Sequence, residues 1–230
     1  INNVATRDMP LAFAEILLQG DAGTTVEMSV LRTTRQDPQK LVLTRAPIVY
    51  PAVSSRLITD QGEPVGLVGT VTLDAGRVRE ISQKIADLQK QGAKRFILDL
   101  RHSSTGAPEE GVALANLFMD RGLIAYTQGQ KVVRQDYVAT ASKQVTKLPL
   151  VVLTNRATAG PAEIAAAALL ESKRAQVVGE RTYGDAAIRN AVKLDDGSAI
   201  ILSVAKYYGP DGKAIQDTFV TPSVVQFETE

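Results

Sequence analysis

The spacing of apolar residues sets the first 46 residues apart from the rest of the chain. Residues 9–18 have helical spacing, with Pro10 suited to a first turn and Gly20 to the stop. The runs 25–31 and 40–44 predict two strands. A helix and a hairpin alone are too small to bury a core. We therefore expect residues 1–46 to be the latter part of a small domain that begins upstream.

Beyond this region the pattern changes to alternating strands and helices. Residues 47–65 contain three prolines and predict a connector with weak extended structure. Residues 66–230 then predict one larger α/β domain with crossover helices. We expect strands at 65–73, 95–100, 148–154 and 175–178, helices at 77–91, 108–118 and 161–172, and mainly strands over 187–208.

Composition narrows the chemistry that this chain can perform. It has 26 Lys and Arg against 25 Asp and Glu, one His and no Cys. The absence of Cys excludes disulfides, thiol nucleophiles and thiolate zinc sites. Because His102 is the one histidine, we do not expect a metal centre built on histidines. We expect neither a metal nor a cofactor. The net charge of +1 gives no general attraction to nucleic acid, and the apolar run 164–170 is too short for a membrane span.

Six segments occur in one order along the chain. They are Gly-Asp-Ala-Gly-Thr at 20–24, Phe-Ile-Leu-Asp-Leu-Arg at 96–101, Pro-Leu-Val-Val-Leu-Thr-Asn at 149–155, Val-Gly-Glu-Arg-Thr-Tyr-Gly at 178–184, Asp-Asp-Gly-Ser-Ala at 195–199 and Tyr-Tyr-Gly-Pro-Asp-Gly-Lys-Ala-Ile at 207–215. Together they resemble the C-terminal-processing (tail-specific) serine peptidase family over almost the whole chain. The resemblance implies a ClpP/crotonase-like α/β peptidase core preceded by part of a PDZ domain. It also implies a periplasmic or otherwise extracytoplasmic location and peptides or protein C-termini as partners.

The resemblance also indicates where the family's catalytic groups should lie. Its nucleophile is the central serine of a Ser-Ala-Ser-Ala-Ser-Glu stretch, which here reads Thr-Ala-Gly-Pro-Ala-Glu at 158–163. Gly160 therefore occupies the nucleophile position. The lysine base, 25 residues later, corresponds to Asp185, and the family's glutamine corresponds to Arg189. A serine–lysine mechanism has neither its hydroxyl nor its amine at these positions.

The oxyanion site implied by the resemblance is altered as well. One donor should be the backbone N–H of the residue after the nucleophile, but Pro161 has none. The other should come from the loop that ends at Gly106. Losing one such donor typically costs about 10² to 10³ in rate. Glu163 matches the family's glutamate, and it either orients the site or belongs only to the first turn of its helix.

Other residues could in principle supply the missing chemistry. Thr158 or Ser104 could be a displaced nucleophile, although a turn or capping role is the simpler interpretation of Thr158. The remaining candidates are weaker, because each has an ordinary structural interpretation. They are His102 paired with Ser103 or Ser104, Ser172 with Lys173, and Lys206 as a substitute base. Asp185 and Arg189 could form an opposite-charge pair, either filling a former catalytic pocket or lying on the surface.

The leading hypothesis is a catalytically inactive family member that binds peptides or protein partners. In the PDZ-like part, Pro10, Phe13 and Leu17 would line a peptide groove along the helix 10–18. The strand and carboxylate-binding loop of such a groove should precede Ile1, so this chain alone should bind C-termini poorly. An active peptidase with a displaced nucleophile is the alternative. A small-ligand binder built on the same core is a third possibility.

Overall fold

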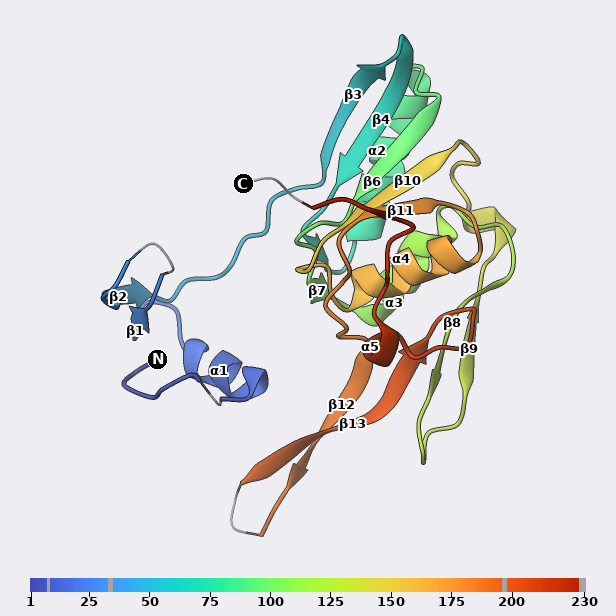
Figure 1. Cartoon of the computed structure of the whole chain (residues 1–230). Helices are drawn as coiled ribbons and strands as arrows, with labels where there is room; N and C mark the ends of the chain where they lie inside the picture. The colour runs from blue at the N-terminus through green and yellow to red at the C-terminus, as the bar shows by residue number, and fades with distance from the viewer. Residues whose placement is uncertain (8, 33–34, 196–197, 228–230) are drawn as a thin grey trace. The chain divides into compact units, whose positions relative to one another are not determined.

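A computed structural model describes residues 1–7, 9–32, 35–195 and 198–227 of the chain (Figure 1). The chain divides into two compact units, residues 1–49 and 50–230. Among the described residues, no helix is both long and apolar enough to cross a membrane.

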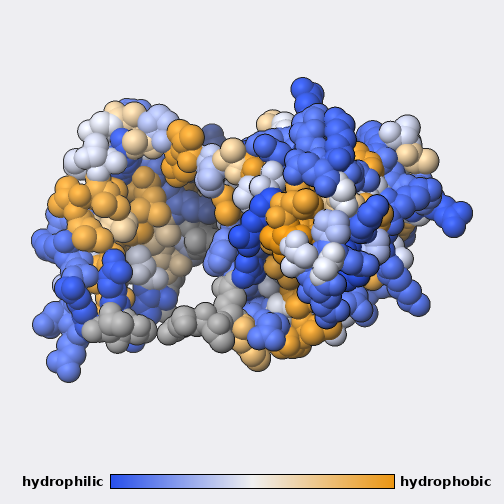
Figure 2. Space-filling view, turned by 90° about the horizontal axis from the view of Figure 1, so that it is seen from above, coloured by the Kyte–Doolittle hydropathy of each residue, from blue (hydrophilic) through white to orange (hydrophobic). Residues whose placement is uncertain are grey.

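The first unit consists of one helix and one antiparallel hairpin. Helix α1 (Leu11–Leu18) precedes strands β1 (Thr25–Val30) and β2 (Gln39–Thr44), as the apolar spacing predicts. The Arg45 guanidinium joins them, donating hydrogen bonds to the carbonyls of Leu17, Leu18 and Thr25 at 2.8–3.1 Å. Large apolar side chains such as Ile16 remain exposed, and Figure 2 shows hydrophobic side chains across the visible face of this unit.

The second unit is organised around a six-stranded sheet. Its strand order is β14-β11-β10-β6-β4-β3, in which all neighbours are parallel except β3 and β4. The strands are β3 (Ser54–Asp60), β4 (Glu63–Gly69), β6 (Arg95–Asp99), β10 (Leu150–Thr154), β11 (Gln176–Gly179) and β14 (Val224–Val225). The predicted parallel α/β core is therefore present.

The β3–β4 hairpin is the main departure from the sequence prediction. Residues 54–60 form a regular edge strand in place of weak extended structure, and β4 ends four residues earlier than expected, at Gly69. Gln61 and Gly62 both have positive φ angles, of 48° and 84°, and make the two-residue turn between these strands. The neighbouring prolines concealed this turn signal in the sequence.

Three helices cover the buried face of the sheet. They are α2 (Arg77–Lys90), α3 (Pro108–Asn116) and α4 (Pro161–Glu171). Alternate strand residues such as Phe96, Leu98 and Val152 are buried, and nearly every residue of α4 is buried. Helix α3 approaches α4 closely at Gly111. A Cβ added there would lie 2.8 Å from the Pro161 carbonyl carbon and closer still to its oxygen. This contact fixes the first turn of α4 against α3.

A second, antiparallel sheet has the order β12-β13-β8-β9, and its β12–β13 hairpin projects from the unit (Figure 1). Both strands of the hairpin lie within the predicted region 187–208, whereas β8 and β9 were not predicted. The remaining elements are β5 (Thr72–Leu73), β7 (Thr105–Gly106), β8 (Leu123–Gln128), β9 (Gln135–Val138), the 3-10 turn η1 (Ala141–Lys143), β12 (Ala187–Lys193), β13 (Ala199–Tyr208) and α5 (Ile215–Thr218).

Substituting Gly111 by alanine tests the α3–α4 contact. In an unconstrained helix this change stabilises by roughly 0.8–1.0 kcal/mol. Here we expect the opposite sign, a loss of about 1–3 kcal/mol, because the new methyl group overlaps the Pro161 carbonyl. Chemical denaturation measures the effect. An unchanged or higher free energy of unfolding for Gly111→Ala would show that the two helices are not in this contact.

Candidate functional site

The candidate site lies at the carboxyl ends of the parallel strands of the main sheet. Strands β6, β10 and β11 end at this edge and lead into the loops 100–106, 155–160 and 180–186. Ligand sites of open parallel sheets typically occur at such an edge. The predicted residues Gly106, Gly160 and Asp185 fall on these three loops, one on each.

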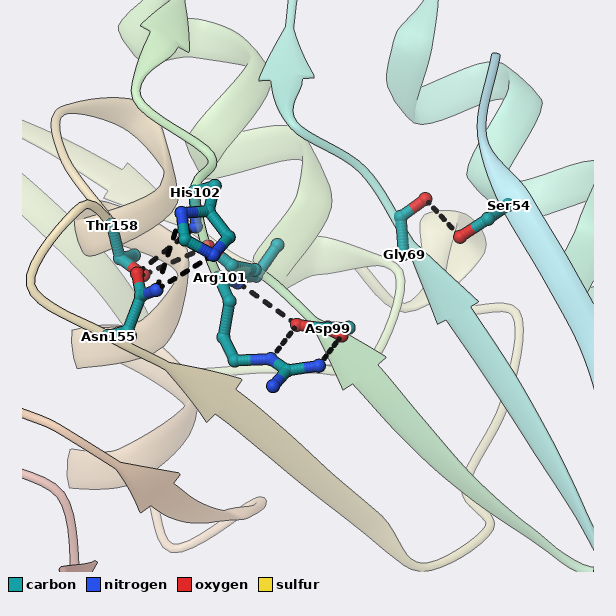
Figure 3. Close-up of polar contacts among 8 residues, drawn as sticks. Ser54, Gly69, Asp99, Arg101, His102, Asn155 and Thr158 are labelled. Atoms are coloured by element: carbon teal, nitrogen blue, oxygen red, sulfur yellow. Dashed lines mark hydrogen bonds and ion pairs between the residues drawn. The ribbon is translucent and has the colours of Figure 1, made fainter. Parts of the chain in front are cut away.

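Two of these loops are tied together by Asn155 and Thr158 (Figure 3). The Asn155 Oδ1 atom accepts hydrogen bonds from the backbone N–H of His102 and Ala157, both at 3.1 Å. The Thr158 hydroxyl donates to the Leu100 carbonyl at 2.9 Å and accepts the Asn155 N–H at 3.0 Å. The loop at 100–106 is thereby held against the turn that leads to Gly160.

An open groove of about 360 Å³ borders the first of these loops. Ser54, Gly69, Asp99, Arg101 and His102 lie along it, with the Arg101 guanidinium in a two-point ion pair to Asp99 at 2.7–2.9 Å (Figure 3). The ion pair fixes the direction of the chain as it leaves β6. The groove is lined by both polar and apolar groups.

Gly160 lies at the sharp turn between strand β10 and helix α4. Its φ and ψ angles of 58° and −119° belong to a region that side-chain-bearing residues rarely adopt. Pro161 follows as the first helical residue, as the sequence predicted. A strained turn between a strand and a helix is also where the nucleophile elbow of hydrolases presents its serine. A Cβ at Gly160 would lie 3.6 Å from the Asp185 carbonyl oxygen, an ordinary contact, so a side chain fits there sterically.

Glu163 joins this turn to the third loop. Its side chain is fully buried, and one carboxylate oxygen accepts the N–H groups of Gly160 and Asp185 at 3.0 and 2.7 Å. The other oxygen accepts the Gly184 N–H at 2.7 Å and the Thr182 hydroxyl. Glu163 therefore positions the backbone of the turn and of the loop at once, which is more than a first-turn glutamate requires.

Burial and hydrogen bonding act on the Glu163 carboxyl in opposite directions. Burial raises its pKa, because removing a carboxylate from water disfavours the charged form. The hydrogen bonds from Thr182, Asp185, Gly184 and Gly160 lower the pKa and offset only part of this effect. The net shift is upward.

The Asp185 side chain turns away from Glu163 and forms an ion pair with Arg189 on strand β12. Both side chains are about one third exposed or more, so this is a surface pair rather than a sealed replacement for a buried dyad. Lys206 lies on the neighbouring strand and donates to both carboxylate oxygens of Asp217 at 2.7 and 2.8 Å. The Lys206 ammonium is thus held by the Asp217 carboxylate.

Two backbone positions were expected to bind an oxyanion, Pro161 and Gly106. Pro161 contributes no N–H at the start of α4. Gly106 has a φ angle of 128° and pairs with Leu73 between the short strands β5 and β7. A Cβ at Gly106 would overlap the Leu73 backbone, so glycine is required at this position.

The alternative nucleophiles are placed differently from one another. Thr158 is fully buried, and its hydroxyl is used as both donor and acceptor within the turn. Ser103 is buried as well, whereas Ser104 is exposed on the loop. The His102 ring faces the Asn155 amide at 3.2 Å rather than either serine. At the far end of α4, the Ser172 hydroxyl approaches the Leu169 carbonyl, and Lys173 is exposed.

The first unit carries the residues expected to bind peptides. Pro10 precedes helix α1 and is exposed, Phe13 is 45 % exposed, and Leu17 is partly buried. In the described ranges, no group of three or more acidic or histidine side chains could hold a metal ion.

Sequence reasoning missed Asn155 and Thr182 as organisers of the site. Asn155 ends the apolar segment 149–155, where a polar residue after a buried strand was the available signal. Thr182 offered no comparable signal, because its bond to Glu163 joins residues 19 positions apart.

The variant Glu163→Gln tests the role of this carboxylate. The amide supplies one acceptor oxygen and directs an NH₂ group toward donors, so we expect a loss of about 2–3 kcal/mol in unfolding free energy at pH 7. Glu109→Gln is the matched control, since Glu109 is an exposed first-turn glutamate of α3. Equal melting temperatures for both variants would contradict the role assigned to Glu163.

Comparisons with known proteins indicate the family to which this chain belongs. The family model described as peptidase family S41 matches residues 65–226. A carboxyl-terminal-processing protease of Picosynechococcus sp. is 34 % identical over 225 residues, which cover 98 % of this chain and 54 % of that protein. The carboxy-terminal processing protease CtpA of Bacillus subtilis is 33 % identical, with coverage of 97 % and 47 %.

A solved structure, the photosystem II D1 C-terminal processing protease, has the same fold with a TM-score of 0.83. It is 31 % identical in sequence, and the match covers 98 % of this chain and 61 % of that one. The chain thus spans about half the length of these curated relatives. The family match over the main unit and the similarity to these relatives show that this chain belongs to peptidase family S41, with the α/β fold of its carboxyl-terminal-processing members.

Proposed function

We propose that this chain is a catalytically silent member of family S41 that acts by binding peptides or protein C-termini. The observation that carries the proposal is the Glu163 carboxylate, which joins the Gly160 turn to the Asp185 loop in a site with no hydroxyl or amine at either position. The backbone of the site is held in place, but residues 160 and 185 supply neither the hydroxyl nor the amine that serine–lysine catalysis needs.

Three separate groups would have to be replaced for serine–lysine catalysis. Gly160 offers no nucleophile, Asp185 offers an ion-paired carboxylate where a base amine is needed, and Pro161 offers no oxyanion donor. A missing donor alone costs about 3–4 kcal/mol of transition-state stabilisation. Because nucleophilic attack, proton removal and oxyanion binding need three different groups, no single neighbouring side chain compensates for all three.

The surroundings of Thr158 and Ser104 give little support to the idea that either is a displaced nucleophile. The Thr158 hydroxyl is buried and holds the turn together through two hydrogen bonds. Ser104 is accessible, and the His102 imidazole, which is close to it in sequence, contacts the Asn155 amide. We therefore assign Thr158 a structural role and leave Ser104 as the residue that an activity assay has to exclude.

Binding of C-termini is supported by the names of the relatives, which describe carboxyl-terminal processing, and by the exposed Phe13 on α1. The relatives process carboxyl termini, so their proteins must recognise chain ends. Here Phe13 is an exposed aromatic anchor on a helix, the kind of residue that binds an extended peptide in a PDZ-like groove. We further propose that residues 1–46 are part of a PDZ domain and that the protein is periplasmic or otherwise exported.

Restoring the three missing groups together tests the proposal. The variant Gly160→Ser, Pro161→Ala, Asp185→Lys should gain cleavage of a casein or tail-peptide substrate, because a side chain at residue 160 fits beside the Asp185 carbonyl. Gly160→Ser alone is the matched control and should remain inactive. The readout is product formation followed by mass spectrometry.

Because residues 1–46 alone are expected to bind C-termini poorly, binding is measured on the full-length protein. The probe is a fluorescent peptide with a free carboxylate, and its amidated form is the control. We expect the free carboxylate to bind more tightly and Phe13→Ala to weaken it. Cleavage by the unaltered protein that Ser104→Ala abolishes would contradict the silent assignment. Equal binding of both peptides would contradict C-terminal recognition.

A further inference from the structure

The β12–β13 hairpin leaves the second sheet at a β-bulge. The register of β13 against β12 shifts by one residue between Ile188 and Arg189, which makes Val204 the extra residue on β13. Strand β8 pairs with β13 only over residues 206–208. A bulge bends its strand and locally interrupts the ladder of hydrogen bonds. Beyond Val204 the hairpin therefore separates from β8 and projects from the unit (Figure 1).

Toward the tip of the hairpin, one edge of β13 is open. Residues 199–203 pair with residues 189–193 of β12, and in the part of the chain that the structure describes no strand pairs with their other side. An open groove of about 700 Å³ runs along this edge, between β13 and the loop 129–132 that follows β8. Gly129 lies against β13 where the groove begins, since a Cβ there would overlap the Val204 carbonyl oxygen. The backbone groups at this edge therefore face open space.

Large apolar side chains cover both faces of the hairpin. Directly paired residues of two strands lie on the same face. Val192, Ile200 and Leu202 therefore share one face, and they are 44, 46 and 48 % exposed. Ile201 lies on the other face and is 45 % exposed. Two strands alone are at best marginally stable in water, and a third strand adds stability. The hairpin thus has both the surface and the energetic reason to accept another strand.

The two edges of the hairpin differ in charge. Strand β12 carries the exposed residues Arg189 and Lys193. Charged side chains, lysine above all, protect an edge strand against pairing with another chain. Residues 199–205 of β13 contain neither a charged residue nor a proline. The edge of β13 is therefore the unprotected one.

We propose that the open edge of β13 pairs with the same edge of a second copy of this chain, antiparallel about a two-fold axis at Ile201. In this register Ile201 faces its own counterpart, and Ile200 of each copy faces Leu202 of the other. The product is a four-stranded sheet in the order β12-β13-β13-β12. Its two rows of Ile200 and Leu202 continue into Val192 on the outer strands, so one face of the sheet becomes a continuous apolar surface.

Symmetry and charge favour a second copy as the occupant of this edge. The pairing is isologous, which means that each copy contributes its one unprotected edge and the assembly closes as a dimer. The outer edges then belong to β12, where Arg189 and Lys193 oppose further addition of strands. The two β12 strands lie three strand spacings apart, about 14 Å, which exceeds the Debye length of about 8 Å at physiological salt. Repulsion between their cations is therefore largely screened.

A single cysteine at the axis tests the pairing. The chain contains no Cys, so Ile201→Cys introduces its only thiol. Directly opposite residues of antiparallel strands have Cβ atoms about 4.5–5.5 Å apart, close to the span of a disulfide. We expect mild oxidation to convert most of this variant into a disulfide-linked dimer on a non-reducing gel.

Ala191→Cys is the matched control. Ala191 is exposed and is the cross-strand partner of Ile201, but it lies on β12, away from the axis. At the same protein concentration and oxidation time, this variant should remain largely monomeric. Equal cross-linking of Ile201→Cys and Ala191→Cys would overturn the proposal, because exposed thiols would then be reacting by chance collision.

A charge-reversal experiment tests the two-fold register. Ile201→Lys and Ile201→Glu each place like charges opposite each other at the axis, so each variant alone should lose the concentration-dependent dimer that sedimentation velocity detects for the unaltered chain. An equimolar mixture should restore the dimer, because lysine then faces glutamate. Circular dichroism verifies that both variants are folded.

The mixture also separates a second copy from other occupants of the edge. An edge that binds an unrelated extended peptide gains nothing when the two variants are mixed, and the same holds for a pairing in another register. Absence of a dimer in the mixture would therefore overturn the proposal. An unaltered chain that stays monomeric at every concentration measured would overturn it as well.

Discussion

The architecture of the site depends on one buried carboxylate, that of Glu163. Burying a charge is costly unless its hydrogen bonds are made inside the protein. Glu163 accepts three backbone N–H groups and one hydroxyl, from the Gly160 turn and from the loop 182–185. These bonds hold two segments in place without any contribution from a nucleophile or a base. The site can therefore hold its shape without a hydroxyl at residue 160 or an amine at residue 185.

Gly160 and Pro161 suit the local structure of the turn between β10 and α4. Gly160 adopts a positive φ angle of 58° without the strain that a serine would store there. Pro161 has the φ angle of a first helical turn and lacks only an N–H that the helix itself does not use. Both residues favour a stable helix start and supply neither a nucleophile nor an oxyanion donor. Stability gained at the expense of activity at a strained site is a general pattern in proteins.

Sequence alone predicted the elements whose apolar spacing is regular, such as α2 and α4. By family resemblance it assigned Gly160 and Asp185 to the candidate site, and this assignment stays a prediction. It missed β3, because prolines on both sides hid the Gln61–Gly62 turn. It could not decide between the two interpretations of Glu163, whose partners lie up to 22 residues away. The hydrogen bond from the Asp211 backbone N–H to the Glu171 carboxyl group joins residues 40 positions apart, and it could not be predicted from the sequence either. Such contacts depend on how strands and helices pack, which local pattern does not encode.

The central claim is that no reactive serine or threonine remains in this family S41 site. Intact-mass spectrometry after prolonged exposure to a fluorophosphonate measures this directly, with an active serine peptidase as the positive control. The account predicts that the mass of the protein is unchanged while the control is fully modified. A stoichiometric adduct that maps to Ser104 or Thr158 would contradict it.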